Sequence, residues 1–142
     1  MIVLDANILI YAYNSSSAHH SKARAWLESA LSSSEVVGIP WRAISAFLRV
    51  MTNPKLPAER WSLEQAAQVV DTWMAHSNVR IVTPGENYWP LFRRMVVEGR
   101  ASGPRVSDAA MAALAVEYGG VMHTTDRDFA RFPGLRWKNP LE

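Results

Sequence analysis

Four of the five aspartates stand where side chains of an α/β protein often do chemistry. Asp5 follows the apolar run 2–4, Asp126 and Asp128 follow a β-rich run over 121–124, and Asp108 lies in the first turn of a helix predicted over 107–118. Because parallel sheets bind ligands beyond the carboxyl ends of their strands, all four are expected to converge. Such hard oxygen ligands suit Mg²⁺ or Mn²⁺, which also keeps crowded carboxylates ionised. A bound Mg²⁺ can activate water for phosphodiester hydrolysis.

Each of these aspartates also has a purely structural interpretation. Asp5 fits a helix N-cap, Asp108 fits the positive end of a helix dipole, and Asp126 and Asp128 fit turn positions. The joint pattern favours a site, because the helix after Asp108 is apolar on all sides and must be buried. A charged residue that leads into a buried helix needs a partner or a metal.

The elements that must position these side chains alternate along the chain. Strands are predicted over 2–4, 36–39, 79–82 and 121–124, with a short fifth over 135–137, and helices over 20–31, 41–51, 62–74, 88–98 and 107–118. A capping-box pattern at Ser62 and Gln65 opens the third helix, and Ser107 is expected to cap the fifth. This alternation predicts an α/β fold around a parallel sheet, and no linker divides residues 1–142, so one domain is expected.

Composition narrows the classes of protein. There are no cysteines, which excludes a disulfide scaffold, thiolate metal sites and a cysteine nucleophile. The net charge is only +2, from 15 basic and 13 acidic residues, so a cluster of four aspartates would leave an arginine-rich remainder suited to a polyanion. No signal peptide or membrane helix is recognised. We therefore expect a cytoplasmic protein, with export by a non-standard route left open.

Several segments, in order along nearly the whole chain, resemble one family. They are 3–11, 40–41 with 47–54, 106–110 with 112–115, 124–132 and 133–137. The opening aspartate motif is weakly specific, whereas the segment around Asp126 is strongly so. The chain resembles a PIN-domain ribonuclease, specifically a VapC-type toxin of a type II toxin–antitoxin system, in a branch abundant in mycobacteria.

This resemblance implies a PIN-like three-layer α/β/α fold with a parallel sheet of four or five strands. It implies Mg²⁺- or Mn²⁺-dependent endonucleolytic cleavage of RNA by a toxin that inhibits translation and growth. Carried over by position, Asp5, Asp108 and Asp126 are metal ligands and Asp128 supports catalysis. Asn7 would hold Asp5 or the metal-bound water.

The resemblance also implies partners: an RNA substrate, a second copy of the chain in a homodimer, and a small VapB-like antitoxin that blocks the acidic groove, with no membrane. Arg100, Arg105 and Arg127 are the candidates for contacts with RNA phosphates. An apolar docking surface for the antitoxin is expected to include Trp41, Phe47, Leu48 and Met51, although burial in the core explains some of them equally well.

One position departs from the family pattern. Many PIN domains carry a glutamate on the second predicted helix, and here that position is Ala46. A rival interpretation is therefore a non-catalytic PIN-fold module that binds RNA or a protein. A small phosphatase with an aspartyl nucleophile at Asp5 is a third, disfavoured because Asn7 replaces the second aspartate that such enzymes usually have there.

Overall fold

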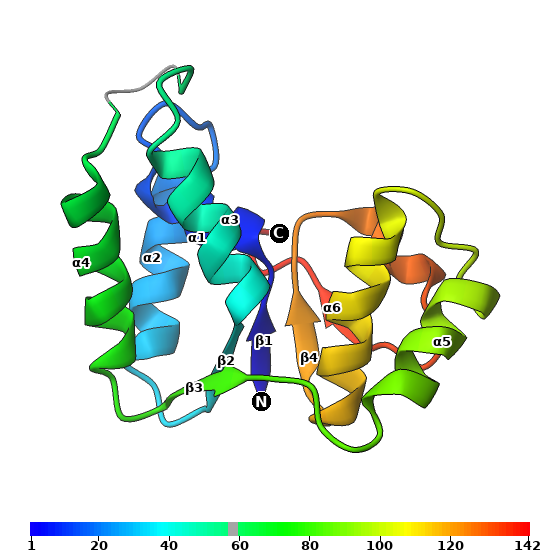
Figure 1. Cartoon of the computed structure of the whole chain (residues 1–142). Coiled ribbons are helices and arrows are strands. Elements are labelled where there is room, and N and C mark those ends of the chain that lie inside the picture. Colours follow the sequence, from blue (N-terminus) through cyan, green and yellow to red (C-terminus); the bar gives the residue numbers. More distant parts are fainter. Residues whose placement is uncertain (57–59) are drawn as a thin grey trace.

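The computed structural model describes residues 1–56 and 60–142, which form a parallel sheet flanked by helices (Figure 1). The sheet has five strands in the order β3-β2-β1-β4-β5, and every neighbouring pair is parallel. The strands are β1 (Ile2–Leu4), β2 (Val37–Pro40), β3 (Val79–Val82), β4 (Val121–His123) and β5 (Trp137–Lys138). The predicted α/β class and the number of strands are confirmed.

The helices follow the predicted order with small shifts at their ends. They are α1 (Ala6–Tyr13), α2 (His20–Leu31), α3 (Trp41–Met51), α4 (Leu63–Met74), α5 (Tyr88–Glu98) and α6 (Arg105–Glu117), followed by a 3₁₀ helix, η1 (Arg127–Arg131). The capping box of Ser62 and Gln65 is present. The expected cap at Ser107 is wrong: α6 begins two residues earlier, after Pro104, so Ser107 lies inside its first turn. Proline is tolerated at a helix start because its φ is already helical.

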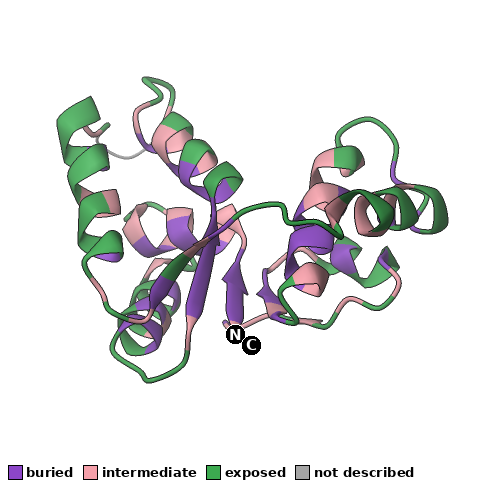
Figure 2. Cartoon of the chain, turned by 60° about the horizontal axis from the view of Figure 1, so that its bottom comes forward, coloured by how far each residue is buried: buried purple, intermediate pink, exposed green. Residues whose placement is uncertain are grey.

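Burial follows the layers (Figure 2). All of β1 and β2 is buried, and α6 buries most of its residues from Ala109 to Ala115, as its all-round apolar sequence predicts. Between α3 and α4, the ring of Phe47 packs against the ring of Trp73 with ring centres 4.7 Å apart. None of the helices in the described ranges is both long and apolar enough to cross a lipid bilayer.

His123 is a packed residue of the sheet. Only 4% of it is exposed, its ring stacks on Trp26 at 5.3 Å, and its Nδ1 lies 2.9 Å from the carbonyl oxygen of Val121. Burial lowers the pKa of His123 below 6.5, and the nearby positive charges of Lys138 and the N-terminus act in the same direction.

This lowered pKa predicts a loss of stability on mild acidification. The unfolded chain takes up the proton near pH 6.5, before the folded protein does. The stability that depends on a neutral His123 is therefore fully present above pH 6.5. It is lost as the pH falls through that value toward the pKa of His123 in the folded protein. Urea unfolding between about pH 7.5 and 5.5 measures it. His123→Phe, which keeps a ring on Trp26, should flatten the dependence, and the exposed His19→Gln should not.

Candidate active site

Strand pairing brings Asp5 beside Thr124. Leu4 of β1 pairs with His123 of β4, so the residues that follow these strands are neighbours at the carboxyl edge of the sheet. The backbone N–H of Asp5 donates to the carbonyl of His123 at 3.1 Å, and the Thr124 hydroxyl donates to Asp5 Oδ2 at 2.7 Å. Asp5 also caps α1, because its Oδ1 accepts from the backbone N–H of Ala6 at 2.7 Å. The structural and the functional interpretations of Asp5 are thus compatible.

Thr124 connects the side chains at this edge of the sheet through hydrogen bonds. The sequence analysis did not identify it as a site residue. It is fully buried, and its Oγ1 accepts from the backbone N–H of Asp126 at 3.0 Å and from Nδ2 of Asn7 at 3.2 Å. One hydroxyl therefore holds Asp5, Asn7 and the start of the Asp126 turn together. Its position directly after β4, opposite Asp5, was the signal that could have identified it.

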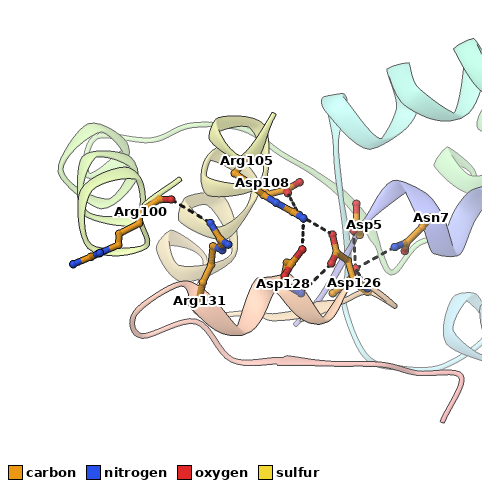
Figure 3. Close-up of polar contacts among 9 residues, drawn as sticks. Asp5, Asn7, Arg100, Arg105, Asp108, Asp126, Asp128 and Arg131 are labelled. Atoms are coloured by element: carbon orange, nitrogen blue, oxygen red, sulfur yellow. Dashed lines mark hydrogen bonds and ion pairs between the residues drawn. The ribbon is translucent and has the colours of Figure 1, made fainter. Parts of the chain in front are cut away.

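The other three predicted aspartates meet around one guanidinium (Figure 3). Arg105 Nη1 lies 3.0 Å from Asp108 Oδ2 and 3.3 Å from Asp126 Oδ2, and its Nη2 pairs with Asp128. Asp126 also caps η1, accepting from the backbone N–H of Asp128 at 2.9 Å. We call Asp5, Asp108, Asp126 and Asp128 the acidic cluster. The four aspartates therefore gather at the carboxyl ends of the parallel strands, as the sequence predicts.

The electrostatics of the acidic cluster favour a cation. Burial raises the pKa of Asp5 above 3.8, and the charges of Asp108 and Asp126 raise it further, against the hydrogen bonds from Thr124 and Ala6. An ionised Asp5 is therefore costly unless positive charge lies near it. The hydrogen bond to Asp108 raises the pKa of the Arg105 guanidinium, which keeps that group charged in the cluster.

The donor atoms of the cluster suit a hard divalent cation. Besides the carboxylates, the side-chain oxygen of Asn7 is buried and has no hydrogen-bond partner among the described residues, a costly condition that a cation or its bound water relieves. Within residues 1–56 and 60–142, no three His, Cys, Asp or Glu side chains are already arranged around one metal position. Three of the carboxylates instead face Arg105. The ligand chemistry fits Mg²⁺ or Mn²⁺, provided that the guanidinium moves.

The three arginines predicted to contact RNA lie in different settings. Arg105 is inside the acidic cluster. Arg100 has an exposed side chain that points away from the cluster in Figure 3, and its carbonyl accepts from Arg131 at 3.1 Å. Arg127 is exposed and pairs with Glu142 at 2.7 Å. The structure thus brings only Arg105 to the acids.

Ala46 and the predicted apolar docking residues lie on α3. Ala46 is half-buried and lines a surface cavity, so no acid from α3 joins the cluster. Phe47 and Met51 are core residues, which leaves Trp41, 55% exposed, and the half-buried Leu48 to form any docking surface. The core explanation therefore holds for two of these four residues.

Comparisons with known proteins show which family this chain is similar to. The family model described as PIN domain matches residues 2–135. The chain is 35% identical over 142 residues to Ribonuclease VapC43 of Mycobacterium tuberculosis, covering 100% of this chain and 97% of that protein. It is 36% identical over 140 residues to Ribonuclease VapC37 of the same species, covering 99% and 97%.

Solved structures share the fold at low sequence identity. FitAB bound to an IR36 DNA fragment matches with a TM-score of 0.71 at 18% identity, covering 100% of this chain and 96% of that chain. VapC20 of Mycobacterium tuberculosis, described as a sarcin-ricin loop cleaving toxin, matches with a TM-score of 0.67 at 16% identity, covering 96% and 99%. VapBC2 of Rickettsia felis, bound to a promoter DNA fragment, matches with a TM-score of 0.67 at 22% identity, covering 98% of each chain.

Proposed function

The chain belongs to the PIN-domain family and, within it, to the VapC ribonucleases, and from this premise we propose that it is a metal-dependent endoribonuclease, the toxin of a toxin–antitoxin pair. The observation that carries the proposal is the acidic cluster at the carboxyl edge of the sheet, built from three separate segments of the chain. Its donor set suits Mg²⁺ or Mn²⁺.

In this proposal Asp5, Asp108 and Asp126 hold the cation and Asp128 supports it from η1. The bound ion supplies an activated water and offsets charge on the phosphate oxygens. Asp5 is fixed by α1 and by Thr124, so its carboxylate presents one orientation to the ligand. Asn7 keeps its amide N–H on Thr124, which leaves its oxygen free to orient a ligand or water. Such support of the ligating groups is what fixes a metal site in place.

The proposal includes partners and location. Solved structures of similar fold include VapBC2 and VapBC-1, and we infer a VapB-like antitoxin for this chain. A homodimer is a further part of the proposal. The exposed Trp41 at the start of α3 supports an apolar contact there.

We treat residues 1–142 as one PIN-like domain, in line with a core that extends from Ile2 to Leu141. A cytoplasmic location is part of the proposal, since the RNA substrate is there.

The test is cleavage of a structured RNA pool by the purified chain in Mg²⁺, Mn²⁺ or EDTA. We expect cleavage in either metal, none in EDTA, and none by Asp108→Asn in any buffer, because that variant removes one carboxylate of the acidic cluster. RNA that is bound but never cut by the wild type would contradict the proposal and favour the non-catalytic module. Phosphate release from a small ester, with the RNA intact, would favour a phosphatase.

A further inference from the structure

A cavity of about 300 Å³ opens on one face of α3. Its lining residues, Arg42, Ser45, Ala46 and Arg49, are spaced three or four positions apart and therefore share that face. Two arginines thus border a hollow whose floor includes the small side chain of Ala46. The proposed function uses none of these residues.

Within the described part of the chain, no carboxylate forms an ion pair with either of these two arginines. Arg24, Arg94 and Arg127 each pair with a glutamate at 2.7 Å. Arg42 and Arg49 are exposed, and neither makes an ion pair or a side-chain hydrogen bond with any residue in 1–56 or 60–142. The guanidinium groups of Arg42 and Arg49 therefore give the cavity a positive charge and N–H donors that no described residue uses.

The cavity lies next to the acidic cluster. β2 pairs with β1 in a register that continues to place Pro40 opposite Asp5, so α3 begins one strand away from that carboxylate. Burial and the charge of Glu117 raise the pKa of Tyr88 on α5, and Arg42 lies close enough to oppose them in part. The Tyr88 hydroxyl donates at 3.3 Å to Ala110 of α6, two residues beyond Asp108. In Figure 1, α3 and α6 accordingly flank the end of β1.

Alanine at position 46 keeps this charge available. Many PIN domains carry a glutamate at this position. In this chain it would stand four residues after Arg42 and three before Arg49, where helical ion pairs form. Such a carboxylate would fill the hollow and neutralise both arginines. Ala46 does neither, so the cavity stays open between Arg42 and Arg49.

We propose that the cavity of Arg42, Ser45, Ala46 and Arg49 binds a phosphate group of the RNA next to the one being cleaved. The inference rests on the proposed function, since it names where that substrate is held. Arginine is suited to this task because its planar fork donates two hydrogen bonds to phosphate oxygens. The Ser45 hydroxyl supplies a further donor on the same face.

The test measures RNA binding without catalysis. Fluorescence anisotropy of a labelled RNA is recorded in EDTA for the wild type, for Arg42→Gln with Arg49→Gln, for Ala46→Glu, and for the control Arg24→Gln, whose arginine is paired with Glu28. We expect both cavity variants to bind RNA roughly tenfold more weakly and the double variant to lower the salt-dependence slope by about 0.7, the loss of one phosphate contact on a single strand. The control should match the wild type.

The kinetic readout separates this role from a structural one. In Mg²⁺ the double variant should raise KM and leave kcat nearly unchanged, and Lys at both positions should restore part of the affinity. If the folded variants bind RNA as tightly as the wild type, the inference is wrong and the proposed function still stands. The same holds if the variants lose binding to an acidic peptide but keep their affinity for RNA. A wild type that neither binds nor cuts RNA overturns the proposed function and the inference together.

Discussion

Asp5→Asn should lower the rate of RNA cleavage by about a thousandfold or more, the scale typical when one member of a catalytic unit is removed. The substitution takes one negative charge and one hard oxygen from the position that faces both Asp108 and Asp126. A divalent cation loses both coordination and Coulomb attraction there. Single-turnover cleavage at saturating metal measures the loss, and isothermal titration with Mn²⁺ should show weaker binding in parallel.

The same variant should fold at least as well as the wild type. Asparagine keeps an oxygen that can accept from Ala6, and it removes the buried charge at the loss of the hydrogen bond from Thr124, whose oxygen already accepts from Asn7 and Asp126. Because the folded pKa of Asp5 lies above the unfolded value of 3.8, ionising it costs the metal-free protein stability as the pH rises through these two values. Asp5→Asn should therefore have an equal or higher melting temperature in EDTA at pH 7, and this advantage should disappear below about pH 3.8.

Asp71→Asn is the matched control, because Asp71 is the one aspartate outside the acidic cluster and lies exposed on α4. It should leave cleavage, Mn²⁺ binding and stability unchanged. Normal cleavage by folded Asp5→Asn would remove Asp5 from the catalytic set. If that variant instead unfolds in EDTA, the inferred cost of the buried charge is wrong.

The position of the acidic cluster was predictable because it depends on the parallel direction of the strands and on which residues follow them. Asp5 and Asp126 each follow a strand, and parallel strands that pair bring such residues to one edge whatever the details of packing. The helix of Asp108 had to be buried because it is apolar on all sides, and that fixed its place beside the sheet. Hydrophobic periodicity was sufficient for these features.

The features that the sequence could not determine depend on side-chain directions and volumes. Arg105 stands three residues before Asp108. This spacing allows its side chain either to point outward toward RNA or to contact the carboxylates. In the structure it contacts the carboxylates. Thr124 looked like any strand-end threonine until the register placed it against Asp5. The α3 cavity depends on side-chain volume at Ala46, which no periodicity reports.

The position of Arg105 gives the second large effect, on metal affinity. Its guanidinium contacts the oxygens of Asp108, Asp126 and Asp128, and a divalent cation must compete with it for the same charge. Arg105→Gln removes the competing charge, so we expect Mn²⁺ to bind about tenfold more tightly, within the usual range for groups that adjust a metal site. Isothermal titration measures the affinity directly, and the Mg²⁺ midpoint for cleavage should fall with it.

Removal of the metal should reveal the opposite effect of the same arginine. In EDTA, Arg105→Gln leaves three neighbouring carboxylates without a cation, and their repulsion should lower the melting temperature relative to the wild type. The stabilisation by saturating Mg²⁺ should then be larger in the variant, because binding to the folded state stabilises it in proportion to affinity. Arg24→Gln is again the control for loss of one paired surface arginine. Equal or weaker Mn²⁺ binding by folded Arg105→Gln would mean that the guanidinium assists the cation, for example by orienting Asp128, and does not compete with it.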